Sequence, residues 1–233
     1  MGVTLIRCVR YAALTLLSAL MLAPLAWADD SKDQLRQVSA DLKSNEAVKK
    51  RKAVKTASQM GSSAKALAPL LIQLLDKDRD VLVRRGTAEA LGNIGGDPKT
   101  TIQALARALK DEDEEVINHA STSLSKYGKD AVPTLRAALK EKDNKVRQHA
   151  AEAISRIGPD AKEATGDLLK AYEAEAPNMR RGNVVKATYV IALGNIGPDA
   201  KEAIPVFEAF LKERNPDRQL QRVVTEALRK IKK

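Results

Sequence analysis

The sequence predicts an all-α protein, a right-handed α-solenoid (superhelix) of about six helical hairpins, and three observations predict it. Hydrophobic residues make up 44% of the 233 residues but aromatic residues only 3%. A core built from Ala, Leu, Ile and Val suits closely packed helices better than a β-sandwich or barrel. The sequence also repeats itself, and within each repeat apolar residues recur at helical spacing. Stacked hairpins of this kind share one continuous core.

The repeats align on the residue that closes each of them. Ala-Leu-Gly-Asn-Ile-Gly occurs at 90–95 and again at 192–197, and Gly-Pro-Asp-Ala-Lys-Glu-Ala occurs at 158–164 and at 197–203. The closing position recurs every 30 to 39 residues, at Gly61, Gly95, Gly128, Gly158, Gly197 and Lys232. The sequence therefore predicts one solenoid over 29–233, with units at about 31–61, 62–95, 96–128, 129–158, 159–197 and 198–233.

Each unit is predicted to contain two helices. In the second half of a unit, residues that we expect to be buried stand twelve, eight, four and one residues before the closing position, as Val83, Thr87, Leu91 and Ile94 do. Steps of four, four and three place these side chains on one face of a helix. The glycine then ends that helix, because a residue without Cβ can adopt the left-handed conformation. The first half predicts another amphipathic helix, with Pro69, Pro133 and Pro205 near the starts.

Residues 1–28 predict a cleaved secretory signal peptide. Arg7 and Arg10 precede an uncharged stretch, 11–28, that ends in the small-x-small site Ala26-Trp27-Ala28. The alternative is an uncleaved membrane anchor, although Pro24 interrupts a run at the lower limit for a spanning helix. We therefore expect an exported protein, in the periplasm or outside the cell. Cleavage would also remove the single cysteine, Cys8, and with it any disulfide or thiolate metal site.

The pattern Asp-x-Asp, a branched apolar residue and Arg, then Ala-x-x-Ala-Leu-x-x-Ile-Gly recurs in the units. It is clearest in Asp78-Arg79-Asp80, Val83-Arg84 and 90–95, and next in Asp143, Val146-Arg147 and 154–158. This pattern resembles a HEAT repeat, of the short kind found in phycobilin-lyase-like and related bacterial proteins. The resemblance covers nearly all of the chain after residue 28. It implies the fold more firmly than the function, because such repeats serve as scaffolds, chaperones, lyases and an iron hydroxylase.

Acidic residues precede the second helices. Four of them stand three residues before the first buried-type position, namely Asp80, Asp113, Asp143 and Asp217. A row of catalytic carboxylates is one interpretation. The favoured one is structural, because an acid at a helix N-terminus accepts hydrogen bonds from free N–H groups and suits the helix dipole. The resemblance implies that these residues, with Arg84 and Arg147, also form a ladder that links neighbouring units.

His119 and His149 both stand nine residues before their closing glycine, in adjacent units. Packed helices lie about 8–10 Å apart, so the two should share a surface but not readily chelate one ion. A zinc site needs about three or four protein ligands, and the His-Glu pairs of the hydroxylase relatives are missing. The sequence therefore predicts no metal site, cofactor or catalytic residue, and no mature-chain motif of an enzyme. The two histidines are instead candidates for lining a binding groove.

The resemblance implies that the second helices line a concave face. Basic residues near the starts of these helices form a candidate binding strip, represented by Lys50, Arg51, Arg85 and Arg222. Without Arg7 and Arg10, 38 basic residues face 30 acidic ones, a net charge of +8, which favours an acidic partner. The alternative is that half of these cations complete the ladder and the rest are solvated. The fifth unit is the longest, and its extra residues predict a loop with partner contacts at Tyr172, Arg180 and Arg181; the alternative is a neutral insertion.

Together these features predict an exported, non-catalytic scaffold or protein-interaction module, acting as a monomer. Its partner would be another protein, bound through the concave face and the fifth-unit loop. Nucleic acid is a poor candidate, because few aromatic residues are available for base stacking. Membrane contact is expected only through an uncleaved signal. The alternatives are an accessory lyase-like enzyme and a groove for anionic lipid or polysaccharide.

Overall fold

The computed structural model describes residues 31–175, 180–213 and 217–233, and all regular structure in these ranges is helical. The first pair of helices covers residues 31–42 and α2 (Ala47–Met60). Short 3-10 segments join most of the later pairs. These pairs are α3 (Ala68–Lys77) with α4 (Val81–Ile94), α5 (Pro98–Ala108) with α6 (Glu114–Lys126), α7 (Val132–Ala138) with α8 (Asn144–Ile157), α9 (Thr165–Ala174) with α10 (Arg180–Ile196), and α11 (Ile204–Leu211) with α12 (Arg218–Ile231). The predicted all-α solenoid of about six hairpins is confirmed.

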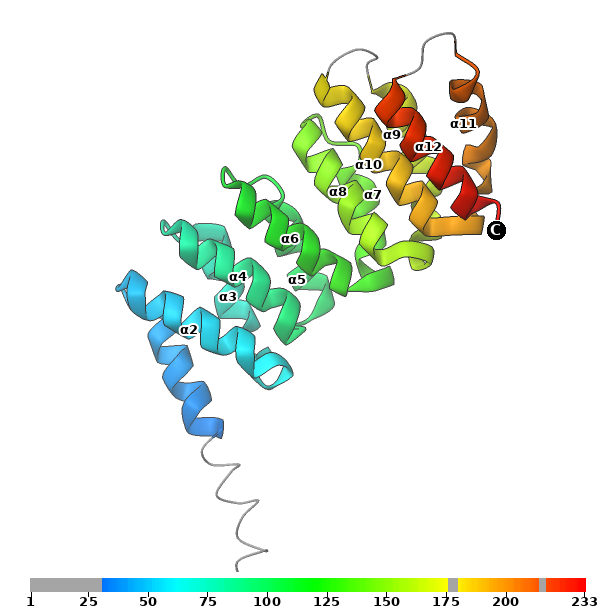
Figure 1. Cartoon of the computed structure of the whole chain (residues 1–233). Coiled ribbons are helices and arrows are strands. Elements are labelled where there is room, and N and C mark those ends of the chain that lie inside the picture. Colours follow the sequence, from blue (N-terminus) through cyan, green and yellow to red (C-terminus); the bar gives the residue numbers. More distant parts are fainter. Residues whose placement is uncertain (1–30, 176–179, 214–216) are drawn as a thin grey trace, which may run out of the picture.

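The helices form two layers (Figure 1). The second helices, α2, α4, α6, α8, α10 and α12, stack side by side in one layer, and the first helices stack in the other. Contacts between neighbouring second helices are more extensive than those between neighbouring first helices. The layer of second helices is therefore the more closely packed of the two. We call the solvent side of this layer the second-helix face.

The core lies between the two layers and follows the predicted stripe. Val83, Leu91 and Ile94 are completely buried, as are the equivalent Val116, Leu124 and Ile154, which are at most 1% exposed. The five closing glycines all have positive φ, between 53° and 78°, in agreement with the prediction that glycine ends each second helix. Lys232 closes the sixth unit with an ordinary φ of −85°.

A different glycine sets the close packing of the second helices. Gly92 of α4 faces Ser123 of α6, and a Cβ at this position would lie 2.3 Å from Ser123 Oγ and 2.9 Å from Ser123 Cα. Its counterpart, Gly194 of α10, is less tightly enclosed, since a Cβ there would lie 3.0 Å from Ala227 Cα. The third residue of the repeated Ala-Leu-Gly-Asn-Ile-Gly motif therefore permits backbone-to-backbone contact between units.

The turn aspartates cap the second helices. Their side chains accept backbone N–H hydrogen bonds at the starts of α4, α6, α8 and α12, and the residues are Asp80, Asp113, Asp143 and Asp217. This is the structural role that the sequence favoured. Among the described residues, no helix has both the length and the apolar character needed to cross a membrane.

Candidate binding face

Four basic residues near the starts of α2 and α4 join consecutive units. Each of them pairs with an acid in the turn that precedes the next second helix. The pairs are Lys50–Asp78, Arg51–Asp80, Arg84–Asp111 and Arg85–Asp113. In the last of these the guanidinium is bidentate, with N–O distances of 2.7 and 2.6 Å. Three of the predicted partner-binding residues, Lys50, Arg51 and Arg85, are thus engaged in holding the array together.

Charge pairing lowers the pKa of two acids of this ladder, Asp113 and Asp80. The Arg85 guanidinium beside Asp113 lowers the pKa of that carboxyl to about 2, and the backbone N–H of Val116 adds to the effect. Arg51 lowers the pKa of Asp80 in the same way. Each of the two carboxylates therefore caps its own helix and also forms an ion pair with an arginine of the preceding unit. Neither is available as a catalytic acid near neutral pH.

His149 and His119 have different surroundings although they share a repeat position. His149 is only 4% exposed, with Nε2 3.0 Å from Glu114 of α6 and Nδ1 3.1 Å from Glu152 of α8. Burial lowers the pKa of His149, but these two carboxylates outweigh it, and the pKa is raised overall. His119 is half-buried. No group of three or more His, Cys, Asp and Glu side chains in the described part of the chain could hold a metal ion.

The fifth-unit candidates fall into two groups. Tyr172 is buried. Its ring lies edge-on to the Phe207 ring, with 5.8 Å between the two centroids, and the Lys186 ammonium lies 5.1 Å from the centroid of the Tyr172 ring. It connects α9 to α11 inside the core, so the structure does not present it on a loop surface. Helix α10 begins at Arg180, but the side chains of Arg180 and Arg181 lie outside the described residues. Arg222, by contrast, is exposed on α12.

The residues on the second-helix face occupy the same positions in every unit, and their hydrophobicity differs from unit to unit. On each second helix the solvent side is formed by the residues thirteen, ten and six positions before the closing residue, such as Leu82, Arg85 and Glu89 in the second unit. In the fifth unit these positions hold Val184, Ala187 and Ile191. This row is the only wholly apolar one in the six units. It is bordered on α12 by the half-buried Val223.

A pocket of about 260 Å³ opens beside this apolar row, between α10 and α12. It is lined by Ile191, Gly194, Arg222, Val223, Glu226, Ala227 and Lys230. Two of its charged groups are engaged, because Glu226 pairs with Arg229 at 2.6 Å and Lys230 donates to Asn195 Oδ1 at 2.9 Å. Arg222 makes no ion pair with any residue that the structure describes.

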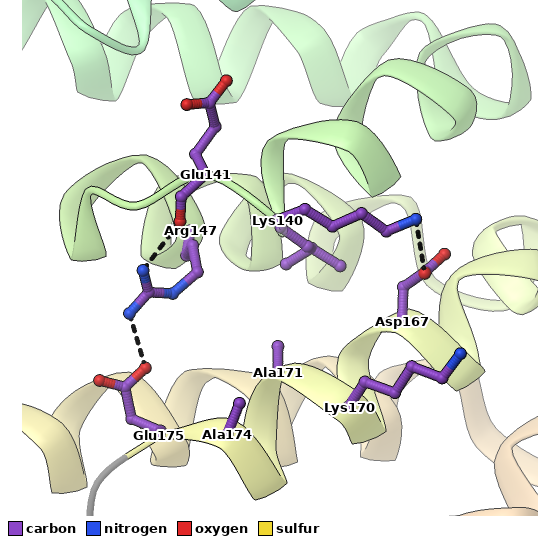
Figure 2. Close-up of a pocket in the computed structure, with 9 residues that line it drawn as sticks. Lys140, Glu141, Arg147, Asp167, Lys170, Ala171, Ala174 and Glu175 are labelled. Atoms are coloured by element: carbon purple, nitrogen blue, oxygen red, sulfur yellow. Dashed lines mark hydrogen bonds and ion pairs between the residues drawn. The ribbon is translucent and has the colours of Figure 1, made fainter.

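Two larger pockets open between first helices. One of about 490 Å³ lies between α7 and α9 (Figure 2). Most of its charged groups are paired, since Arg147 donates to the Glu141 carbonyl and to Glu175, both at 2.9 Å, and Lys140 lies 3.1 Å from Asp167. The other, of about 630 Å³, lies between α5 and α7 and is floored by alanines. Both are gaps between units in the more loosely packed layer.

The family model for HEAT repeats matches residues 33–126 and 102–187. The chain belongs to the HEAT-repeat family. A search of curated proteins finds no match.

Solved structures similar to this HEAT chain include other helical-repeat proteins. An engineered protein is 22% identical with a TM-score of 0.52, over 85% of this chain and 96% of its own. A Kap121p mutant is 18% identical with a TM-score of 0.52, and the match covers 86% of this chain but only 23% of Kap121p. A designed armadillo repeat protein is 23% identical with a TM-score of 0.49, over 84% and 99% of the two chains. At these identities the likeness concerns the fold alone.

The apolar row of the fifth HEAT unit was missed by sequence reasoning. Basic residues drew attention because they recur, whereas Val184 and Ile191 stand in a helix that is apolar almost all round. Counting the solvent positions of every unit from its closing residue would have found the row. The structure adds the neighbouring pocket and shows which cations near it are already paired.

Proposed function

We propose that this HEAT-repeat protein is a non-catalytic scaffold that binds another protein through its second-helix face. One observation carries the proposal. The large hydrophobic side chains that stay exposed in the described chain all lie on second helices: Val48 is 74% exposed, Leu82 45%, Val184 51% and Ile191 43%. Single exposed hydrophobic residues are ordinary, but a contiguous row rimmed by polar groups marks an interaction site. The fifth unit supplies such a row.

The remaining surface supports the same use. In the pocket between α7 and α9, Arg147 pairs with Glu175 and Lys140 pairs with Asp167, which leaves these groups no evident chemical role. The second-helix face instead carries the exposed apolar row of the fifth unit. The excess of basic residues favours an acidic partner. Export belongs to the proposal too, and it is supported by the order of basic, apolar and small-x-small segments in residues 1–28.

Capture from an envelope extract tests the scaffold. The purified protein, carrying a photo-crosslinker on the second-helix face, should capture a specific protein, and the double variant Val184→Asp/Ile191→Asp should lose it. Gln73 is exposed on α3 in the opposite layer, so Gln73→Asp is the matched control and should retain the capture. Equal capture by all three proteins would show that the second-helix face is not used.

Mass spectrometry of the mature protein tests export. The expected amino terminus is Asp29, in an extracytoplasmic fraction. Recovery of the chain from the cytosol with residues 1–28 intact would contradict it.

A further inference from the structure

We infer that the pocket between α10 and α12 binds a polypeptide segment that presents a branched aliphatic or aromatic side chain next to a carboxylate. This inference rests on the proposed function and names the chemistry of the partner. It follows from two independent features of one site, namely an arginine that lacks the acid its equivalents have and an apolar cavity beside it.

Arg222 occupies a ladder position. It stands ten residues before its closing residue, as Arg51 and Arg85 do in their units. Both of those arginines pair with the aspartate that caps the next second helix, and Arg85 grips Asp113 through two hydrogen bonds. Arg222 has no acidic partner among the residues that the structure describes.

The molecule itself therefore shows which group this position accepts. A guanidinium matches a carboxylate in bidentate geometry better than it matches any other side chain. At the α4–α6 junction the carboxylate comes from the same chain. Arg222 lines the pocket between α10 and α12, so a carboxylate from a partner at the edge of this pocket can pair with its guanidinium. Because the neighbouring acid Glu226 is held by Arg229, it does not satisfy Arg222 instead.

The cavity beside Arg222 is shaped for an apolar side chain. Ile191 and Val223 line it together with the small residues Gly194 and Ala227. Its volume of about 260 Å³ lies just below the range of roughly 300–1,000 Å³ found for sites that hold drug-sized ligands. One side chain of a bound segment suits this volume better than a cofactor does. Burial of an apolar anchor beside a charge pair is the usual composition of an interface hot spot.

Peptide display tests the inference with defined probes. A random peptide library on phage is selected against the full-length mature protein, and the enriched peptides are synthesised. We expect sequences in which Asp or Glu lies within a few residues of Leu, Ile, Val or Phe. Their Kd should rise roughly ten-fold or more on Arg222→Glu and on Ile191→Asp. Matched controls are Arg218→Glu, on the same helix, and Gln73→Asp, at an exposed position on α3 in the opposite layer, which should bind as the wild type does.

A charge exchange makes the test specific. Replacing the acid of an enriched peptide by Lys should abolish binding to the wild type and restore it with Arg222→Glu. Enrichment of basic peptides, or of acidic peptides that bind Arg222→Glu and Ile191→Asp normally, would overturn the inference. In the second case peptides still bind the molecule elsewhere and the scaffold proposal survives. A selection that yields no binder to this face overturns the inference, while the scaffold proposal is judged separately by capture of the native partner.

Discussion

The α4–α6 junction and the α10–α12 junction are built from the same repeat but used differently. At the first, Gly92 lies against Ser123, and Arg84 and Arg85 are both paired with acids of the next unit. At the second, Gly194 lies less tightly against Ala227, a pocket opens, and Arg222 is left without an acid. The contrast shows that, inside the array, the arginines are paired with acids of the next unit and the space between the second helices is filled. A surface for partners is left where a pocket opens and an arginine has no acid opposite among the described residues.

The largest effect should come from filling the tight junction. Gly92→Ala places a Cβ against the backbone of Ser123, so one helix must move, and overpacking of this kind costs about 1–3 kcal/mol. Gly194→Ala meets only a 3.0 Å contact, and the better helix propensity of alanine, worth up to about 1 kcal/mol, offsets it. Urea unfolding should show a clear loss of stability for Gly92→Ala and nearly none for Gly194→Ala. Equal losses would mean that the two junctions are equally tight.

An effect of comparable size should come from the buried ladder pair. Arg84 has a side chain only 10% exposed and holds Asp111 through bonds of 2.8 and 3.0 Å, so Arg84→Met leaves a largely buried carboxylate unpaired. We expect a loss of about 2–3 kcal/mol in the free energy of unfolding. Much of it should return in the double variant Arg84→Met/Asp111→Leu. Gln221 stands at the same repeat position on α12, and Gln221→Ala should change stability by less than about 0.5 kcal/mol.

These two junctions also show what the sequence could predict. The buried stripe of Val83, Leu91 and Ile94 follows from helical spacing within one hairpin, and the capping role of Asp113 follows from its place at a helix start. Pairing between units depends on the distance and register of the next helix, which no spacing within a unit supplies. Arg85 and Arg222 therefore look alike in the sequence, although only Arg85 has an acid opposite.

Tyr172 illustrates the same limit. Its place in the longest unit predicted a surface contact, but the rotation of α9 turns its ring toward Phe207 of α11. That rotation is decided by packing against the following unit. Residues whose neighbours come from another hairpin were thus the ones that the sequence could not place.

The α6–α8 junction should respond to alkaline pH. His149 bridges Glu114 and Glu152, while Lys145 pairs with Glu114 and Arg156 lies 3.9 Å from Glu152. Since the pKa of His149 is raised in the folded state, its contribution to stability is fully present below the unfolded value of about 6.5. It is lost as pH rises through the folded pKa. Urea unfolding between about pH 6 and pH 9 should show this loss in the wild type and in His119→Asn, and not in His149→Asn.

The Asp113 carboxyl offers a smaller and more local test of the ladder. Its folded pKa of about 2 lies below the unfolded value of about 3.9, so its contribution to stability is present above the unfolded value and is lost as pH falls through about 2. A carboxyl-carbon NMR titration should give the low value in the wild type and a higher one in Arg85→Gln, because the guanidinium is the main cause. An unchanged titration in Arg85→Gln would assign the shift to the helix cap instead.

The smallest effect on stability should come from Arg222, and this is what separates binding from stacking. Arg85→Ala removes a pair that joins two units, so it should lower stability measurably. Arg222→Ala removes no ion pair within the described residues, so the free energy of unfolding should stay within about 0.5 kcal/mol of the wild type. If thermal unfolding shows Arg222→Ala to be as damaging as Arg85→Ala, Arg222 has a structural partner and the two junctions are equivalent. If Arg222→Ala is silent in unfolding yet weakens peptide binding, the same repeat position serves assembly in one unit and recognition in another.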